Sequence, residues 1–284
     1  MPISIELASA FPSSVFSLYL LLPSRVMDFD YATPFNCLLF DLDDTLYSPA
    51  IGIGRACRNN IEEFLASKCG ISAEEASSLR AELFQSHGSS LAGLIAQGYD
   101  VHPDEYHSYV HGRSPYDLIE PDATLRELLL SVPQRKILFT NSDRRHATRV
   151  LQRLGIEDCF QRIICFETMN PHLFEDATRC SKSPVILKPS AAAMEMAVRL
   201  AGVAPRRTLF LDDSERNIDA GKALDLRTAL VGKRVKTQAA DYLLGSIAEL
   251  KQMIPEIWKK QDGTTTTRSE LELESMRPTT PIGA

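Results

Sequence analysis

Short apolar runs alternate along this chain with segments in which apolar residues recur every three or four positions. The runs have the length of β-strands, and the candidate strands are Cys37–Asp41, Lys136–Thr140, Arg162–Cys165, Thr208–Asp212 and Thr228–Val231. Continuous apolar runs are typical of parallel strands that are buried on both faces. The alternation therefore predicts an α/β fold with a doubly wound parallel sheet covered by helices on both faces.

Helical spacing is clear in three segments between these strands. From Asp143 to Leu154 the apolar residues recur at i, i+3, i+4 and i+7, and Gly155 follows as a helix end. The segment after Pro189 repeats this spacing up to Gly202, and we expect the proline in the first helical turn. A third, shorter helix is expected from Ser214.

The stretch 48–120 contains no clear strand and interrupts the alternation. Helical patterns cover Arg58–Leu65, Ala73–Phe84 and Asp104–Val110. An ordinary crossover has loops of about 2–6 residues around one helix, so this stretch is too long to be one. We therefore expect a helical cap domain, residues 48–120, inserted after the first strand and lying over the end of the sheet.

The remaining residues divide into a core and two terminal segments. We assign 34–47 and 121–260 to the α/β core. Residues 1–33 are expected to be a poorly ordered extension; the apolar patch within them lacks the basic segment that precedes the apolar part of a signal peptide. Residues 261–284 are polar and include four consecutive threonines, which predicts a disordered tail.

Composition excludes several classes of partner. Lys and Arg number 31 against 37 Asp and Glu, a formal charge of −6, so neither nucleic acid nor an anionic membrane is expected as a partner. No apolar run reaches the length of a membrane span. The six cysteines form no CxxC pair, which favours reduced thiols in a cytoplasmic protein. Organelle targeting by residues 1–26 stays open, as does the oligomeric state.

The densest chemistry follows the first predicted strand directly. Asp41, Asp43 and Asp44 stand within four residues, and carboxylates this close repel one another. A bound divalent cation with oxygen ligands is the usual compensation. Ligands of open α/β sheets bind outside the carboxyl ends of the strands, where these acids would lie. The pattern predicts an active site that holds a cation.

Four sites share this character, and each is expected at the end of a strand. They are Asp41-Leu42-Asp43-Asp44-Thr45, Phe139-Thr140-Asn141-Ser142, Lys188-Pro189, and Leu211-Asp212-Asp213-Ser214 with Asn217 one helical turn on. In this order they resemble the four motifs of the haloacid dehalogenase superfamily of phosphohydrolases, over roughly residues 36–258. The resemblance implies a Rossmann-like core with a cap inserted after its first strand.

Within that superfamily the chain is similar to the pyrimidine 5′-nucleotidase-like group of plants and fungi. The stretches that carry this similarity are Cys37–Tyr47, His87–Leu94, Tyr106–Arg113 and Asp212–Asn217. The similarity implies a Mg²⁺-dependent phosphatase that hydrolyses a pyrimidine nucleoside 5′-monophosphate. A sugar-phosphate or lysophospholipid phosphatase with the same site is an alternative, as is a non-catalytic regulatory protein. Asp43 disfavours a dehalogenase, whose leaving group needs no proton, whereas a phosphomutase uses the same two acids.

The resemblance also implies roles for single residues. Asp41 stands at the position of the nucleophile, which forms an aspartyl-phosphate. Asp43 stands at the position of the general acid, which then acts as base toward water. Thr140, Asn141 and Lys188 would contact the phosphoryl group. A different interpretation makes Asn141 and the serine after it helix caps.

The implied Mg²⁺ ligands are acidic. They are Asp41, the backbone carbonyl of Asp43, and the pair Asp212 and Asp213, of which we expect Asp213 to bind directly and Asp212 through water. Asp44 has a simpler interpretation as a cap of the next turn.

Substrate choice is expected to depend on the cap. His111 and Arg113 are candidate substrate contacts there, and Gly88-Ser89-Ser90 with Gly93 suits a turn near the ligand. The other five histidines are interpreted as surface or packing residues. Because 166–187 is a long stretch before the third motif, Lys182 is the alternative should Lys188 be displaced.

Overall fold

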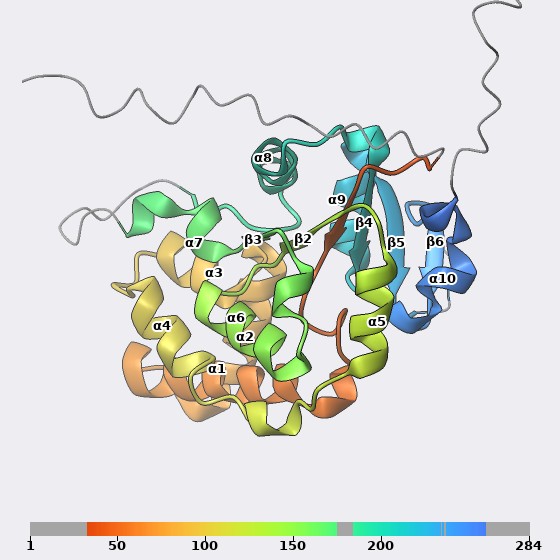
Figure 1. Cartoon of the computed structure of the whole chain (residues 1–284). Helices are drawn as coiled ribbons and strands as arrows, with labels where there is room; N and C mark the ends of the chain where they lie inside the picture. The colour runs from red at the N-terminus through yellow and green to blue at the C-terminus, as the bar shows by residue number, and fades with distance from the viewer. Residues whose placement is uncertain (1–32, 175–183, 234, 236, 260–284) are drawn as a thin grey trace, which may run out of the picture. The chain divides into compact units, whose positions relative to one another are not determined.

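The computed structural model describes residues 33–174, 184–233, 235 and 237–259 (Figure 1). The predictions for residues 1–32, for the tail from 261 and for Lys182 lie outside these residues.

A parallel sheet of six strands forms the centre of the described chain, in the order β3-β2-β1-β4-β5-β6. The strands are β1 Cys37–Phe40, β2 Arg135–Phe139, β3 Arg162–Ile164, β4 Thr208–Asp212, β5 Arg227–Val231 and β6 Tyr242–Leu244. The predicted α/β class and parallel sheet are confirmed, and five strands were predicted to within one residue at each end. Strand β6 was not predicted, because this three-residue edge strand is too short to give a distinct apolar run.

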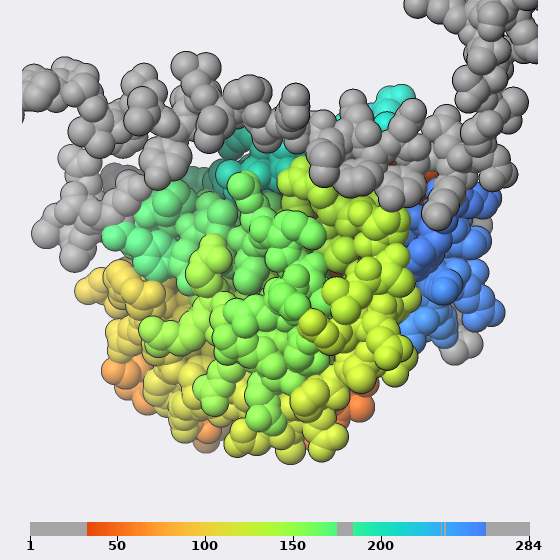
Figure 2. Space-filling model, in the orientation of Figure 1, coloured from red at the N-terminus to blue at the C-terminus, as the bar shows by residue number. Residues whose placement is uncertain are grey.

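Each face of the sheet packs against its own helices because side chains alternate along the strands. Leu38 and Phe40 of β1 enter one core, which includes apolar residues of α5 and α6. Cys37 and Leu39 enter the other, which includes those of α8 and α9. Figure 2 shows the face on which α5 and α6 (yellow-green to green) cover the sheet. These helices are α5 Ala123–Ser131, α6 Arg144–Leu154, α8 Ala191–Ala201 and α9 Glu215–Ala223.

The ends of these helices follow local capping chemistry. Asp143 accepts a hydrogen bond from the backbone of His146 and begins α6, and Gly155 ends it in the left-handed conformation, as predicted. Ser190 is the equivalent cap of α8. Pro189 therefore precedes the cap, and its predicted place in the first helical turn is wrong because a serine side chain starts the helix one residue later.

Four helices lie between β1 and α5, to one side of the sheet (Figure 1). They are α1 Ile53–Cys69, α2 Ala73–His87, α3 Ser90–Ala96 and α4 Pro103–Val110. Their apolar residues, together with Phe166 and Leu187, form a third core that includes Phe64, Leu83 and Tyr106. The expected helical content of 48–120 is present, with α3 as an additional helix. Gly93 was expected in a turn, but it lies inside α3, where an added Cβ atom would be 2.6 Å from a methyl group of Leu83.

Shorter elements complete the described chain. They are α7 Phe166–Met169, α10 Leu250–Met253 and the 3₁₀ turns Pro49–Ile51, Tyr116–Leu118, Glu157–Cys159, Pro171–Leu173, Pro205–Arg207, Ile247–Glu249 and Pro255–Trp258. Among the helices described, none combines the length and the apolar character needed to cross a bilayer.

Helix α9 approaches β4 closely at Gly221, and we expect Gly221→Ala to destabilise the fold. An added Cβ would lie 2.8 Å from the ring of Phe210, a buried residue of β4. Overpacking of this kind costs about 1–3 kcal/mol, which corresponds to a fall in Tm of roughly 3–10 °C. Calorimetry on the variant measures it, with Asp219→Ala on the exposed side of α9 as control. An unchanged Tm for Gly221→Ala would contradict the packing described.

Candidate active site

The carboxyl ends of the three central strands bring three of the predicted motifs together. Asp41 follows β1 and donates its backbone N–H to the Leu211 carbonyl of β4, at 2.9 Å. Thr140 follows β2, and Asp212 is the last residue of β4. Because β1 lies between β2 and β4, these residues are neighbours at one edge of the sheet.

Lys188 joins two of these strand ends through its ammonium group. Its Nζ lies 2.6 Å from Oδ1 of Asp41 and 2.7 Å from Oδ2 of Asp212. Its side chain is 2% exposed and lies against the rings of Phe139 and Phe210, with Nζ 5.1 and 5.7 Å from their centroids. Burial alone would lower the pKa of Lys188, but the two carboxylates outweigh it and raise the pKa. The ammonium group therefore stays charged between two acids.

The backbone around Lys188 is held by asparagine side chains and not by a strand. Asn141 exchanges two hydrogen bonds with the backbone N–H and carbonyl of Lys188, each at 2.9 Å. The buried Asn170 does the same for Ile186, at 2.7 and 3.0 Å. The prediction that Lys188 ends a strand is wrong, because β3 ends at Ile164 and amide side chains replace the pairing of a strand.

Asn141 and Ser142 are not helix caps, because Asp143 takes that role for α6. The Asn141 amide engages the backbone of Lys188, as described above. The Ser142 backbone N–H donates to Oγ1 of Thr140 at 3.0 Å. This bond orients the hydroxyl of Thr140, a residue that is 1% exposed and lines the pocket described next.

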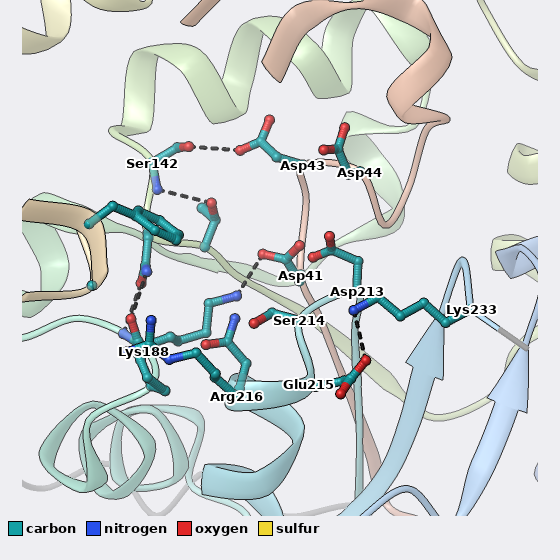
Figure 3. A pocket seen from close by; sticks show the side chains of 16 residues that line it. Asp41, Asp43, Asp44, Ser142, Lys188, Asp213, Ser214, Glu215, Arg216 and Lys233 are labelled. Atoms are coloured by element: carbon teal, nitrogen blue, oxygen red, sulfur yellow. Dashed lines mark hydrogen bonds and ion pairs between the residues drawn. The ribbon is translucent and has the colours of Figure 1, made fainter. Parts of the chain in front are cut away.

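These residues line a pocket of about 610 Å³ (Figure 3). Its floor carries Asp41, Lys188 and Asp213, and its wall includes Phe84 and Gly88 of the helices inserted after β1. In Figure 3 the carboxyl groups of Asp41 and Asp213 point into the same space.

The acids of the pocket outnumber its buried cation. Oxygen atoms of Asp41, Asp212 and Asp213 lie within 4.8 Å of one another. Burial raises the pKa of Asp41 well above its ordinary value; Lys188 opposes this shift, and the carboxylates of Asp212 and Asp213 add to it. Burial and the neighbouring Asp212 raise the pKa of Asp213 to about 6. A hard divalent cation fits this donor set, because its charge would offset both the burial and the mutual repulsion that raise the two pKa values.

Asp212 and Asp44 differ in their hydrogen-bond partners. Asp212 is fully buried and accepts hydrogen bonds from the Ser214 backbone and from Nδ2 of Asn217, both at 2.9 Å, besides its contact with Lys188. Asp44 lines the pocket in a left-handed conformation, with φ of 60°, and its buried Oδ1 has no hydrogen-bond partner. The interpretation of Asp44 as a cap is wrong, since Ser48 caps the following turn.

Asp43 has partners that the sequence reading did not identify. Its Oδ1 lies 2.8 Å from Nε2 of His146 and 2.5 Å from the hydroxyl of Tyr47, and its Oδ2 accepts a hydrogen bond from Ser142 at 2.7 Å. Burial would raise the pKa of Asp43, but His146 and the three hydrogen bonds outweigh it and lower the pKa. The free site thus stabilises the Asp43 carboxylate.

The two predicted substrate contacts of the cap lie elsewhere. Arg113 pairs with Glu63 at 2.7 Å and covers the ring of Tyr109, and it does not line the pocket. His111 also lies outside the lining; it contacts Asp143, and this hydrogen bond raises the pKa of His111 to about 10 despite burial. Neither residue lines the pocket, and each is engaged by a carboxylate of the protein.

The interpretation of His146 as a surface or packing residue needs correction. It is 2% exposed and belongs to the site through Asp43. A signal was present in the sequence, because His146 directly precedes Ala147 on the apolar face of α6 and follows the Thr140 motif by six residues. A histidine on an apolar helix face beside a strand-end motif needs polar partners, and here Asp43 is one of them.

Comparisons with known proteins place this geometry in a family. A model described as haloacid dehalogenase-like hydrolase matches residues 35–225. Phosphate metabolism protein 8 of Saccharomyces cerevisiae is 27% identical over 213 residues, which cover 72% of this chain; the chain spans 63% of that relative. The fold of this chain resembles that of CbbY from Rhodobacter sphaeroides, solved with phosphate (TM-score 0.51, 20% identity, 76% of this chain and 96% of that one). It also resembles the fold of a HAD phosphatase from Thermococcus onnurineus (TM-score 0.50, 18% identity, 77% of this chain and 97% of that one).

The raised pKa of Asp213 makes cation binding depend on pH. Between pH values of about 4 and 6 the Asp213 carboxyl group is protonated in the folded protein but largely ionised in the unfolded chain. Without a cation, the contribution of Asp213 to the free energy of unfolding is therefore lost as the pH rises through about 6. A cation must displace the proton, so Mg²⁺ should raise Tm more at about pH 7.5 than at about pH 5.5. Thermal unfolding with Mg²⁺ and with EDTA at both pH values measures this.

The matched variants for that measurement are Asp213→Asn and the surface change Asp219→Asn. Asp213→Asn should reduce the Mg²⁺ effect at both pH values, and Asp219→Asn should leave it as in the wild type. Equal Mg²⁺ stabilisation at both pH values, or none at either, would contradict the cation site.

Proposed function

Because the chain belongs to the haloacid dehalogenase-like hydrolase family, we propose that it is a phosphatase that hydrolyses a small phosphate monoester through an aspartyl-phosphate. The observation that carries this proposal is the convergence of Asp41, Asp43 and Lys188 on one pocket. A carboxylate nucleophile, a second acid and a buried cation are the groups that such a reaction needs.

Asp41 is the proposed nucleophile. Asp43 first takes up a proton from solvent. One of the carboxylate oxygens of Asp41 then attacks phosphorus, the ester P–O bond breaks, and the leaving oxygen takes that proton from Asp43. Water then attacks the phosphorus of the aspartyl-phosphate, Asp43 accepts a proton from that water, and inorganic phosphate leaves with the Asp41 carboxylate restored. Two contacts orient Asp41 for this role: Lys188 at Oδ1, and the Thr45 hydroxyl, which donates to Oδ2 at 2.9 Å.

Lys188 and Thr140 are the proposed phosphoryl contacts. When a substrate binds, the Lys188 ammonium group can contact the phosphoryl oxygens as well as Asp41. The Thr140 hydroxyl lines the pocket and has a fixed position. Asn141 acts through Lys188, whose backbone it holds, so we assign it to positioning and not to direct contact.

We assign Mg²⁺ as the cation, held by carboxylate oxygens of Asp41 and Asp213 and the backbone carbonyl of Asp43, with Asp212 acting through water. When bound, it supplies positive charge that offsets the repulsion between the Asp41 carboxylate and the phosphate. The clustered oxygens of the three acids support this assignment.

The helices between β1 and α5 serve, in this proposal, as the cap, with 48–120 as one unit and 34–47 with 121–260 as the core. Phe84 of α2 supports this, because it lines the pocket although its side chain is 56% exposed. A flat apolar side chain at the mouth suits a leaving group with an aromatic ring. Together with the resemblance of the chain to pyrimidine 5′-nucleotidases, it favours a pyrimidine nucleoside 5′-monophosphate.

Asp41→Asn should abolish the activity while leaving the fold intact. The amide keeps the shape of the carboxyl group but cannot form the aspartyl-phosphate, so phosphate release from p-nitrophenyl phosphate or UMP with Mg²⁺ should fall about 10³-fold or more. Tm shows whether the variant is folded, and Asp219→Asn is the matched surface control. Turnover by Asp41→Asn at the wild-type rate would rule out the proposed nucleophile.

A panel of monophosphates tests the substrate class. We expect higher kcat/KM for UMP and CMP than for purine nucleotides, sugar phosphates or lysophosphatidate. Phe84→Ala should raise KM for UMP about tenfold, since stacking on an aromatic side chain is worth about 1–3 kcal/mol per base, and should change KM for glycerol 3-phosphate little. Leu118→Ala is the control, because Leu118 is equally exposed at 58% but lies outside the pocket lining. Preference for a sugar phosphate or lysophosphatidate would replace the nucleotidase assignment.

A further inference from the structure

The two oxygens of the Asp43 carboxyl group face different surroundings. Oδ1 contacts the Tyr47 hydroxyl and Nε2 of His146, and neither of these residues lines the pocket. Oδ2 contacts the hydroxyl of Ser142, which does line it. One oxygen is thus anchored in the protein interior, and the other faces the side where a ligand would bind.

His146 is itself fixed from several directions. Its Nδ1 lies 2.7 Å from the hydroxyl of Tyr116, and its ring lies against that of His111, with the centroids 4.3 Å apart. Its side chain is 1% exposed, and its backbone N–H donates to Oδ2 of Asp143 at 3.2 Å, the bond that begins α6. The imidazole has no freedom to turn without losing one of these contacts.

Nε2 of His146 carries a proton toward Oδ1 of Asp43, because a carboxylate oxygen accepts the hydrogen bond between them. Nδ1 faces the hydroxyl of Tyr116, which can donate or accept. The partner of Oδ2 is the Ser142 hydroxyl, which can rotate and can donate or accept a hydrogen bond. Oδ2 therefore remains able to carry a proton while Oδ1 keeps both of its partners.

We propose that His146 is a positioning residue for the general acid: with Tyr47 it holds Oδ1 of Asp43, so that Oδ2 is the oxygen that gives a proton to the leaving group and later takes one from water. This inference rests on the proposed phosphatase function. The ester P–O bond breaks as the Oδ2 proton moves to the leaving oxygen; in the second step one proton of the attacking water returns to Oδ2. His146 keeps its hydrogen bond to Oδ1 throughout and exchanges no proton with the substrate.

The proposal predicts a dependence on the leaving group that a merely structural role would not produce. An alkoxide leaves poorly unless it is protonated, whereas p-nitrophenolate leaves without that help. The ratio kcat/KM reports phosphoryl transfer to Asp41, the step in which the leaving group departs. A misplaced Asp43 should therefore lower kcat/KM for UMP or another alkyl monoester and affect p-nitrophenyl phosphate little.

The experiment compares His146→Leu and His146→Gln on these two classes of substrate. His146→Leu removes the donor, and we expect kcat/KM to fall about 100-fold for the alkyl monoester and less than about 5-fold for p-nitrophenyl phosphate. His146→Gln places an N–H near the position of Nε2 and should recover most of the loss. Tyr47→Phe removes the second Oδ1 contact and should show the same selective loss even if His146→Leu does not fold.

His107→Leu is the matched control. His107 is also a buried histidine, on α4, but its ring contacts are with His111, Tyr106 and Phe166 and not with Asp43. It should change both substrates by the same factor. Equal losses on both substrates in His146→Leu and Tyr47→Phe would overturn the positioning role while leaving the phosphatase intact. A wild-type protein that hydrolyses neither substrate would overturn the proposed function and this inference together.

Discussion

The ammonium group of Lys188, buried between Asp41 and Asp212, is the interaction on which the rest of the site depends. It joins the end of β1 to the end of β4, and it balances two buried carboxylates. Removing one member of such a buried set leaves a charge without compensation, which is far more costly than losing an exposed pair. The same contact sets the position of Asp41 Oδ1 and so connects the stability of the sheet edge to the chemistry proposed for it.

Much of the surrounding structure keeps this lysine in place although it follows no strand. Asn141 and Asn170 bind the backbone of the segment that carries it, as a neighbouring strand would. The neighbouring rings of Phe139 and Phe210 lie against its charged end. Side-chain amides thus supply the order that the sheet supplies for Asp41 and Asp212, and they fix the side of the pocket that we propose contacts the phosphoryl group.

The fold could be predicted from the sequence where the signal was periodic. Buried strands such as β1 and helices with glycine ends such as α6 have patterns that local chemistry determines, whereas β6 is too short to produce one. For the site, residues that follow a strand directly were easy to place together. Contacts made across the fold were not predicted. The hydrogen bonds of Asn141 to the Lys188 backbone, of His146 to Asp43 and of His111 to Asp143 all join residues more than 30 positions apart. Spacing along the chain carries no information on such pairs.

In the proposed reaction the Asp41 carboxylate forms an aspartyl-phosphate, and trapping that intermediate is the most direct test. Wild-type protein turning over a ³²P-labelled monoester with Mg²⁺ would be quenched in acid, digested and mapped by mass spectrometry. We expect ³²P on the peptide that contains Asp41, attached as a base-labile acyl phosphate. Rapid substrate turnover with no label on the protein, or with label on another residue, would contradict it.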